Sequence, residues 1–496
     1  MRSSCLARSV AATAIAAALA GCVPAGGPLP VPRDTAVADA AVRSVPAVPG
    51  AAWPTFGAED GWWRTFGDPQ LDRLIAEGLA GSPDVAAAVA RFRKAAALAG
   101  QARGALLPTL DAQGSASESR ISLNQGYPDT FKAFLPKGWN DAGQLAAAFN
   151  FEPDIWGRAR AQLRAATSEQ EAARVEAQAA RLALASGIAE AYVDLAGLVT
   201  TRDLRKAALA NREATRALVA DREGHGLDTL ANLRLAETQA ALAAADLAAA
   251  EQAVDLRRHQ IAALLGEGPD RGLAIADPAL APVNPVPLPE TATTELVARR
   301  PDLIAARARM EAAAARIKAA RAAFFPAIRL SALYGVQSLG LNLLFDKDSQ
   351  FGNATAAFSL PIFHGGELRA QYGGARADYD SAVAAYDKAV VGAYQQLADA
   401  VTTRGAMARR NADGRRAQAA AEDGLRIARV RYQAGLANYL EVLTAENQAV
   451  TARLGKAASD AGVRAAEIAL IRALGGGYVA TAPVPDIQPA GNAPHE

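Results

Sequence analysis

Side chains that support redox or metal chemistry are scarce in this sequence. It contains two cysteines, four histidines and three methionines among 496 residues. The cysteines both lie near the N-terminus, which excludes a disulfide framework. The histidines lie in unrelated segments without the short spacing that metal ligands share: they are His225, His259, His364 and His495. We therefore expect no enzymatic activity, no metal site and no cofactor.

The sequence also lacks a net charge of either sign and has few aromatic residues. Its formal charge is +1, which gives no electrostatic footprint for nucleic acid, so we expect no partner of that class. Aromatic residues make up only 6% of the chain, and alanine dominates the apolar residues. Such a composition favours long helices with small contact residues over a compact mixed core.

The N-terminus has the pattern of a secretory signal. Arg2 and Arg8 precede an apolar run from Val10 to Ala20 that is too short to cross a bilayer as a helix. The run ends in Leu19-Ala20-Gly21-Cys22, which resembles the lipobox of bacterial lipoproteins, where the cysteine is acylated. A plain signal peptide with an incidental cysteine is the alternative. The following residues are rich in Pro, Ala and Gly and indicate a flexible tether.

The rest of the chain contains an internal repeat. Gly226 follows Phe149 by 77 positions and Gly435 follows Phe358 by 77 positions, while Gly266 and Gly475 each come 40 positions later. Upstream, residues 83–108 match residues 301–326 at an offset of 218, whereas the later parts match at 209. The nine residues that differ fall in a loop, and tolerance of such a length change indicates that the loop is exposed.

Four segments alternate between apolar and polar residues with the period of a strand. They cover residues 109–117, 144–151, 328–336 and 356–362. Each is about as long as a membrane-spanning strand and has one apolar and one polar face. A bilayer admits only helices and closed barrels, and four strands cannot close a barrel, so a membrane location requires several protomers to share one. A soluble four-stranded sheet is the alternative.

Each repeat continues as a long helical hairpin. From Arg158 to about Arg222 there is no proline, which predicts a helix of about 65 residues and about 100 Å. Apolar residues repeat at coiled-coil spacing, first along this helix and then along the returning one: Leu184, Ile188, Ala191, Leu195 and Leu198, followed by Leu235, Leu242, Ala249 and Leu256. Helices of this length cannot bury their stripes in an ordinary globular domain, so the sequence predicts an elongated assembly.

The order of these features resembles one known family. The matching stretches run from Trp63 to Pro69, from Phe151 to Arg158 and from Arg431 to Gly435, and the repeat closes with Leu474-Gly475-Gly476-Gly477. Together with Cys22 they resemble the TolC-like outer-membrane efflux family, in its acylated OprM/NodT-type branch. The resemblance covers about Trp62 to Tyr478.

This resemblance implies a mainly α fold with a membrane β-barrel. A homotrimer would form a twelve-stranded barrel in the outer membrane and a tunnel of helical hairpins across the periplasm. The implied function is a passive duct that exports small molecules, supplied by a periplasmic adaptor protein and an inner-membrane RND pump. Two alternatives stay open: the outer-membrane duct of a type I protein secretion system, and a structural trimeric lipoprotein without a pore.

The corresponding domain organisation has six parts. We expect a signal peptide (1–21), a lipid-anchored tether (22–61), a first repeat (62–266), a proline-rich connector (267–300), a second repeat (301–477) and a C-terminal tail (478–496).

Three groups of site residues follow. Cys22 is the expected lipidation site. The expected hairpin tips, where the resemblance implies adaptor docking, are Gly226, Leu227, Gly435 and Leu436. The candidate periplasmic gate, in which charges of both signs could hold neighbouring hairpins together, comprises Asp423, Arg426, Arg429, Arg431, Tyr432 and Glu441. A solvated charged face is the alternative for each gate residue.

The lipobox pattern predicts that the mature chain begins at an acylated Cys22. Mass spectrometry of protein purified from membranes should show an N-terminal peptide that starts at this residue and carries acyl chains. An unmodified N-terminus elsewhere in the chain would contradict the prediction.

Overall fold

The computed structural model describes residues 27–32, 61–124, 126, 128–283, 285–286, 288 and 299–478. The predicted signal peptide, Cys22 and most of the tether and tail lie outside these residues. The described chain falls into two compact units. The first comprises Lys94–Gln170, Ala308–Val383 and the N-terminal residues up to Val31, and the second comprises the remainder.

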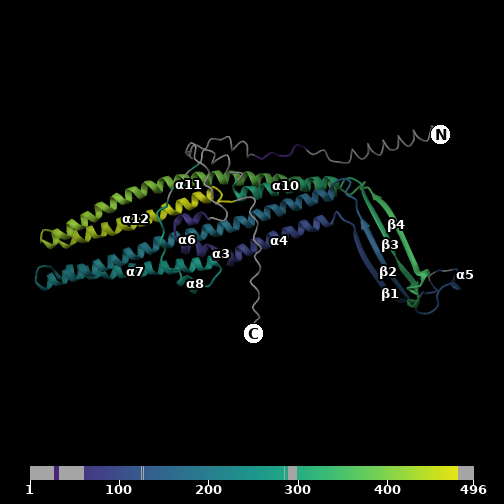
Figure 1. Cartoon of the computed structure of the whole chain (residues 1–496), viewed down its shortest axis with the longest axis horizontal. Helices are drawn as coiled ribbons and strands as arrows, with labels where there is room; N and C mark the ends of the chain where they lie inside the picture. Colours follow the sequence, from purple (N-terminus) through teal and green to yellow (C-terminus); the bar gives the residue numbers. More distant parts are fainter. Residues whose placement is uncertain are drawn as a thin grey trace. The chain divides into compact units, whose positions relative to one another are not determined.

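The first unit contains one antiparallel sheet in the order β1-β2-β3-β4 (Figure 1). Its strands are β1 (Thr109–Ser119), β2 (Asn140–Phe151), β3 (Ala327–Leu339) and β4 (Gln350–Ser359). The loop between β1 and β2 carries the short helix α5 (Asp129–Lys132), and the loop between β3 and β4 carries two single turns, η2 (Leu341–Leu343) and η3 (Lys347–Ser349). The four strands expected from the alternating pattern are therefore present.

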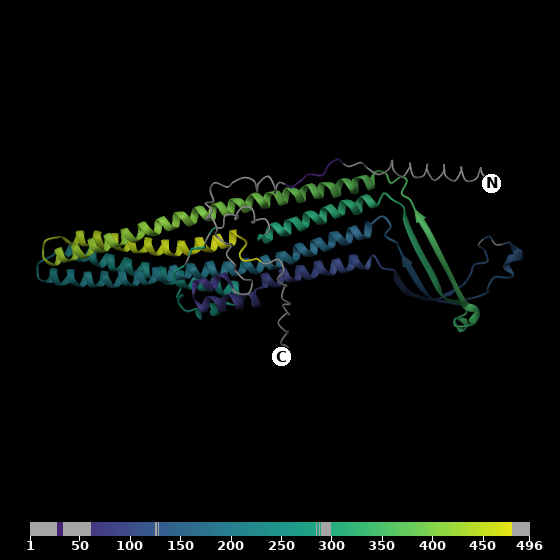
Figure 2. The same ribbon diagram turned by 45° about the horizontal axis from the view of Figure 1, so that its top comes forward.

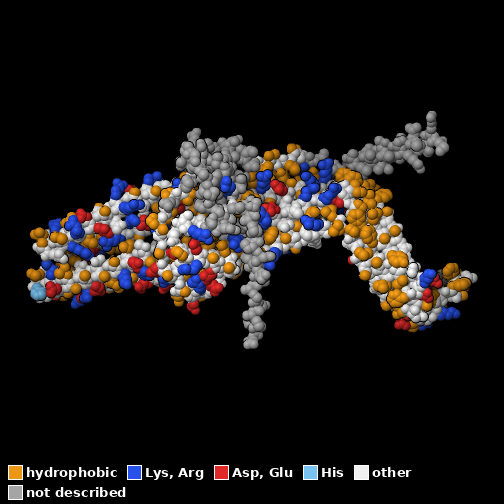
Figure 3. Space-filling model, in the orientation of Figure 1, with side chains coloured by type: hydrophobic (Ala, Val, Ile, Leu, Met, Phe, Trp, Pro, Cys, Tyr) orange, Lys and Arg blue, Asp and Glu red, His pale blue; other side chains and the backbone are white. Residues whose placement is uncertain are grey.

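The register places apolar residues of all four strands on one face of this sheet. Leu110 pairs with Phe149, Phe149 with Ala332, and Ala332 with Ala354. The opposite face carries mainly small or uncharged polar residues, among them Gln113, Ser115, Gln144, Ser331, Asn353 and Thr355. On the face visible in Figure 3, charged side chains are sparse over the strands and frequent over the helices. The two faces thus suit two different solvents.

The predicted end of the fourth strand was wrong. The alternating pattern extended to Ile362, but β4 begins at Gln350 and ends at Ser359. Pro361 has no N–H to donate to a ladder, which explains why pairing stops before it.

A helix precedes each pair of strands in the chain. The two are α4 (Pro83–Gly104) and α10 (Pro301–Ala322), which lie in the matching segments 83–108 and 301–326 of the repeat. Within the first unit, α10 packs on α11 through a buried cluster made of Ala313, Ile317, Phe324, Tyr372, Tyr379 and Val383.

Two long helical hairpins follow the strands. The first consists of α6 (Arg158–Gly224) and α7 (Leu230–Leu265), and the second of α11 (Glu367–Gln433) and α12 (Tyr439–Ala473). Helices α6 and α11 each contain 67 residues, about 100 Å at 1.5 Å per residue. The hairpins lie side by side in both ribbon views (Figures 1 and 2). Their equal lengths reproduce the repeat seen in the sequence.

The coiled-coil prediction holds for α6 but not for α7. On α6, Leu184, Ile188, Ala191 and Leu195 are all buried. On α7, Leu242 and Leu256 are 56% and 58% exposed. In the same stretch α7 instead buries the smaller residues Ala236, Ala240, Ala250 and Val254, which lie one or two positions from the predicted stripe. Leu242 and Leu256 therefore lie on another face of the helix.

The main core of the second unit surrounds the middle of α6 and the end of α7. It is formed by η1 (Trp62–Phe66) and α3 (Pro69–Gly81), which pack on the middle of α6, with α8 (Pro269–Leu273) beside α7. The Tyr192 hydroxyl donates to Asp68 over 2.6 Å, and Asp68 in turn accepts from the backbone N–H of Ala279. One buried stretch of α6 is apolar enough to cross a membrane by composition, but 56% of it is buried inside the protein.

The two faces of the sheet predict opposite responses to a charge. Ala332→Arg places a cation at the centre of the apolar face, where lipid contact would cost about 2–4 kcal/mol. We expect this variant to be lost from the outer-membrane fraction. Ser331→Arg, its neighbour on the polar face, is the matched control and should be recovered like the wild type. Equal recovery of the two variants would contradict the assignment of the faces.

Candidate functional site at the hairpin tips

Both hairpins turn at the predicted glycines with the same backbone geometry. Gly226 and Gly435 have φ values of 69° and 75°, a left-handed conformation that glycine adopts at little cost. The N–H of Leu227 donates to the carbonyl of Arg222 over 2.8 Å, and the N–H of Leu436 donates to that of Arg431 over 2.8 Å. These bonds form the Schellman motif, which satisfies the last carbonyls of each long helix.

Each returning helix then starts from a capping side chain. Thr229 accepts from the N–H of Asn232, and Asn438 accepts from the N–H of Glu441. The tips present apolar side chains to solvent, since Leu227 and Leu436 are 66% and 71% exposed. An added Cβ at Gly226 or Gly435 would meet no atom within 4 Å, so each tip is open on its outer side.

A hydrogen bond joins the two tips. The Tyr432 hydroxyl, at the end of α11, donates to Asp228 Oδ2 in the first turn over 2.9 Å. The Arg222 guanidinium lies 4.9 Å from the centre of the Tyr432 ring, and its Nε is 3.9 Å from the same Asp228 oxygen. We call Arg222, Asp228 and Tyr432 the tip cluster. It connects side chains 204 positions apart in the sequence.

The charges in the tip cluster favour this bond at neutral pH. Burial alone would raise the pKa of the Asp228 carboxyl, but hydrogen bonds from Asn232, Thr229 and Tyr432, together with the charge of Arg222, hold it below its ordinary value. Burial and the bond to Asp228 raise the pKa of Tyr432 to about 12. Because folding lowers its pKa, the Asp228 carboxyl stabilises the fold at any pH above the ordinary carboxyl pKa. That contribution is lost only as the pH falls through the lowered pKa. The bond therefore persists in mild acid.

A buried ionic network lies behind the tip cluster. Glu446 on α12 is 3% exposed, and its carboxylate accepts from Arg212 on α6 over 2.5 Å and from Arg429 on α11 over 2.9 Å. Thr215 donates to the same carboxylate over 3.1 Å. Glu446 is the acceptor that all three donors share, so its loss would leave the buried Arg212 without a carboxylate partner. The network therefore ties α6, α11 and α12 together.

The residues of the candidate gate make different contacts. Asp423 pairs with Arg426 over 2.7 Å within α11, and Arg431 pairs with Glu441 over 2.6 Å across the second turn. Both pairs lie inside the second hairpin, and it is Tyr432 and Arg429 that contribute to contacts between the two hairpins of this chain. Tyr432 does so directly, and Arg429 does so through Glu446.

Sequence reasoning missed Arg222, Asp228, Arg212 and Glu446 as site residues. A comparison of the two repeats could have pointed to Arg222. Arg222 and Arg431 occupy the same place in the repeat, and their guanidinium groups lie 3.5 Å and 3.4 Å from the carbonyls of Leu227 and Leu436. Asp228, however, corresponds to Ala437, and Tyr432 corresponds to Glu223. The contact forms where the repeats differ.

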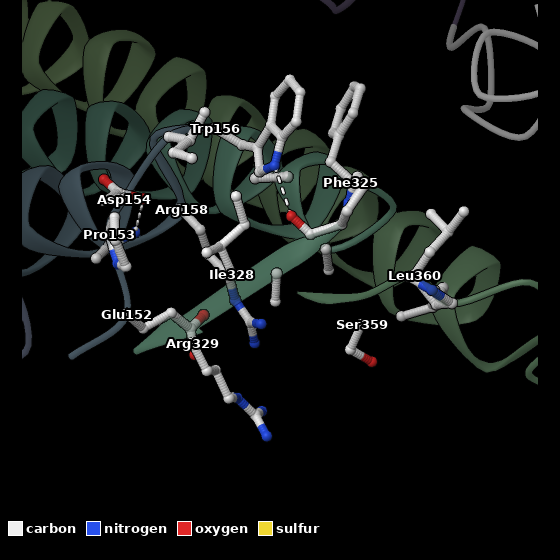
Figure 4. A pocket seen from close by; sticks show the side chains of 18 of the residues that line it. Glu152, Pro153, Asp154, Trp156, Arg158, Phe325, Ile328, Arg329, Ser359 and Leu360 are labelled. Carbon is white, nitrogen blue, oxygen red and sulfur yellow. Dashed lines mark hydrogen bonds and ion pairs between the residues drawn. The ribbon is translucent and has the colours of Figure 1, made fainter. Parts of the chain in front are cut away.

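The first unit contains a cavity of about 630 Å³ where its strands pass into helices. Trp156 stacks on Phe325 with ring centres 4.8 Å apart and donates its indole N–H to the carbonyl of Pro326 over 2.7 Å. Figure 4 shows these rings on one side and Glu152 and Arg329, 3.4 Å apart, on the other. Among the described residues, no group of three or more His, Cys, Asp or Glu side chains is placed to hold a metal ion. The residues that line the cavity belong to the junctions between strands and helices.

Comparison with known proteins relates this geometry to one family. The profile of the family described as "Outer membrane efflux protein" matches residues 74–267 and 293–476. Fusaric acid resistance protein FusA of Burkholderia cepacia is 32% identical over 74% of this chain and 69% of its own length. Pyoverdine export outer membrane protein OpmQ of Pseudomonas aeruginosa is 31% identical over 84% of this chain and 87% of its own length.

A solved structure shows the same fold. The crystal structure of the outer membrane protein VceC from Vibrio cholerae superposes with a TM-score of 0.77 and 38% identity. The match covers 84% of this chain and 98% of that chain. The predicted combination of long helical hairpins and a small sheet is thus confirmed.

The tip cluster predicts that one hydroxyl controls the order of both tips. Tyr432→Phe removes the bond to Asp228 and keeps the ring, at a cost of about 1 kcal/mol. Hydrogen exchange of the amides of Gly226 and Leu227 should become faster. Glu441→Gln, which alters a pair inside the second hairpin, is the control and should leave the first tip unchanged. The same exchange in both variants would show that the hydroxyl does not order the first tip.

Proposed function

Because the chain belongs to the outer membrane efflux protein family, we propose that it is the outer-membrane duct of a tripartite export system. In this proposal a homotrimer receives small molecules from an inner-membrane RND pump through a periplasmic adaptor. The duct supplies no energy and performs no chemistry.

The observation that carries the proposal is a two-faced sheet with open edges. Among the described strands, β1 pairs only with β2 and β4 only with β3. An unpaired edge cannot face hydrocarbon, because its N–H and C=O groups would have no partners. Three protomers joined through β1 and β4 form a twelve-stranded barrel without edges, and a barrel of that size leaves a lumen. The apolar face then contacts lipid and the polar face lines the pore.

The helical hairpins offer a second surface for the same assembly. Leu242 and Leu256 project from α7 on a face that its own hairpin does not cover. These two exposed leucines are fourteen residues, or two heptads, apart, so they lie on one stripe of the helix that suits contact with a neighbouring helix. We assign this stripe to contact between protomers, where it closes the periplasmic tunnel.

The tips supply the docking site for the adaptor in this proposal. Gly226 and Gly435 make tight turns that display Leu227 and Leu436 to solvent. Two similar apolar tips per chain give six per trimer, enough for a partner that binds around the tunnel end. A leucine with little packing against its own protein costs solvation energy unless a partner covers it.

The tip cluster is the proposed gate. It fastens the first hairpin to the second at the end of the tunnel, so its release would allow the tips to move apart. We assign Asp423, Arg426, Arg431 and Glu441 to the charged surface around this contact, and Arg429 to the network that supports it.

The names of two relatives support the export of small molecules. One relative is named for resistance to fusaric acid and another for export of pyoverdine. A pore-free stalk would have no use for a sheet with one apolar face. The lipid anchor at Cys22 remains part of the proposal, and it would hold each protomer at the membrane during assembly.

The proposal predicts trimers that conduct ions. Native mass spectrometry of the purified protein should give three chains per particle, and planar bilayers should show discrete single channels. Monomers without conductance would overturn the proposed function.

The gate predicts a difference between two double variants. Arg222→Gln with Tyr432→Phe removes both side chains that hold Asp228 from α6 and α11, and should raise single-channel conductance severalfold. Asp423→Asn with Glu441→Gln, which neutralises pairs inside one hairpin, should change it much less. A larger effect of the second pair would return the gate to the charges first predicted.

A further inference from the structure

A short N-terminal segment lies against helix α11 in the first unit. Arg376 donates from Nη2 to the carbonyl of Gly27 over 2.8 Å and to that of Pro28 over 3.3 Å. The Tyr379 hydroxyl donates to the carbonyl of Pro30 over 3.3 Å. Arg376 and Tyr379 are three positions apart on α11 and therefore share one face of the helix. Three hydrogen bonds thus hold residues that are almost 350 positions away in the sequence.

The chemistry of the segment fits these donors. Residues 27–32 read Gly-Pro-Leu-Pro-Val-Pro, with proline at every second position. Proline has no N–H, so such a segment cannot pair as an ordinary strand and favours an extended conformation whose carbonyls point outward. A guanidinium group and a tyrosine hydroxyl are suitable donors for these carbonyls.

Packing fixes one of the two donors. The Tyr379 ring is 9% exposed and belongs to the buried cluster with Ile317, Phe324 and Tyr372. The ring is therefore packed inside the cluster while its hydroxyl reaches the segment. The segment itself is exposed at Gly27, Pro28 and Pro30, so its attachment depends on these hydrogen bonds more than on burial.

We propose that Arg376 and Tyr379 form a clamp for the N-terminal tether, and that this clamp positions the lipid anchor of Cys22 beside the end of the sheet. The second half of the proposal rests on the acylation of Cys22 in the proposed function. The first half does not depend on it.

The lengths involved support this role. Cys22 precedes Gly27 by five residues, which span at most about 18 Å. Arg376 follows Glu367, the first residue of α11, by nine residues, or about 14 Å along the axis. An anchor held at the clamp can therefore reach the start of α11.

The chain beside the start of α11 is apolar and open to solvent. Ile362 and Phe363, which follow β4, are 84% and 87% exposed. They follow Phe358, a residue of the apolar face that is 79% exposed, by four and five positions. In the proposal, acyl chains delivered there would enter the same lipid layer as the strands. Without the clamp, the next described residue, Gly61, lies 39 residues from Cys22, a contour of about 130 Å. With the clamp, five residues of sequence separate Cys22 from Gly27, the first residue that α11 holds.

The clamp can be tested with a nitroxide label on Leu29→Cys in the full-length purified protein. We expect a slow-moving label in the parent chain and in Arg369→Ala, a matched arginine on the same helix. Arg376→Ala with Tyr379→Phe should shorten the rotational correlation time severalfold, since it removes all three hydrogen bonds and keeps the buried ring. Equal label mobility in the three proteins would overturn the clamp.

The number of labels separates the clamp from the proposed anchor. One label per chain means that Cys22 is blocked by acylation, as proposed. Two labels mean that the anchor, and with it the positioning role, is wrong, and the clamp is then measured in a Cys22→Ser background where only position 29 reacts.

Positioning has its own readout. A photo-crosslinking amino acid in place of Phe363 should capture the N-terminal peptide in the parent chain and in Arg369→Ala, and should lose it in the clamp variant. Equal capture in all three proteins would overturn the positioning role.

Discussion

The requirement that backbone groups in hydrocarbon find partners governs this structure. The inner strands β2 and β3 are hydrogen-bonded on both sides, whereas β1 and β4 are each paired on one side only. A lone protomer therefore cannot meet the requirement. The described strands number four, and the proposed trimer would supply the missing partners of β1 and β4. Helix α7 raises a similar question, because its exposed Leu242 and Leu256 are not covered within this chain.

Duplication gave two hairpins of the same design, and divergence at the tips made them interact. Arg222 and Arg431 occupy equivalent places, yet one joins the tip cluster and the other pairs with Glu441 inside its own hairpin. The difference arises because the second copy has Ala437 where the first has Asp228, and the first copy has Glu223 where the second has Tyr432. The two tips are joined by the bond from the Tyr432 hydroxyl to Asp228, by Arg222 beside both groups, and by a buried cluster in which Val219 and Ala236 of the first hairpin meet residues of the second.

The sequence predicted the strands, the lengths of the long helices and the turns, because each depends on local periodicity or on glycine. It predicted the buried side of α6 for the same reason. It failed on α7, which exposes Leu242 and Leu256 of the predicted stripe and buries alanines such as Ala236 and Ala240. The tip cluster and the network of Arg212 and Glu446 depend on how two hairpins pack across more than 200 residues of sequence. No local pattern reports such a pairing.

The equal length of α6 and α11 restricts how this protein can change size. Deleting one residue from only one of these helices would move its tip by about 1.5 Å and rotate it by about 100°. The 2.9 Å contact between Tyr432 and Asp228 would not survive that displacement. A length change that preserved this contact would therefore need an equal change in α6 and α11, two helices that begin 209 positions apart in the sequence.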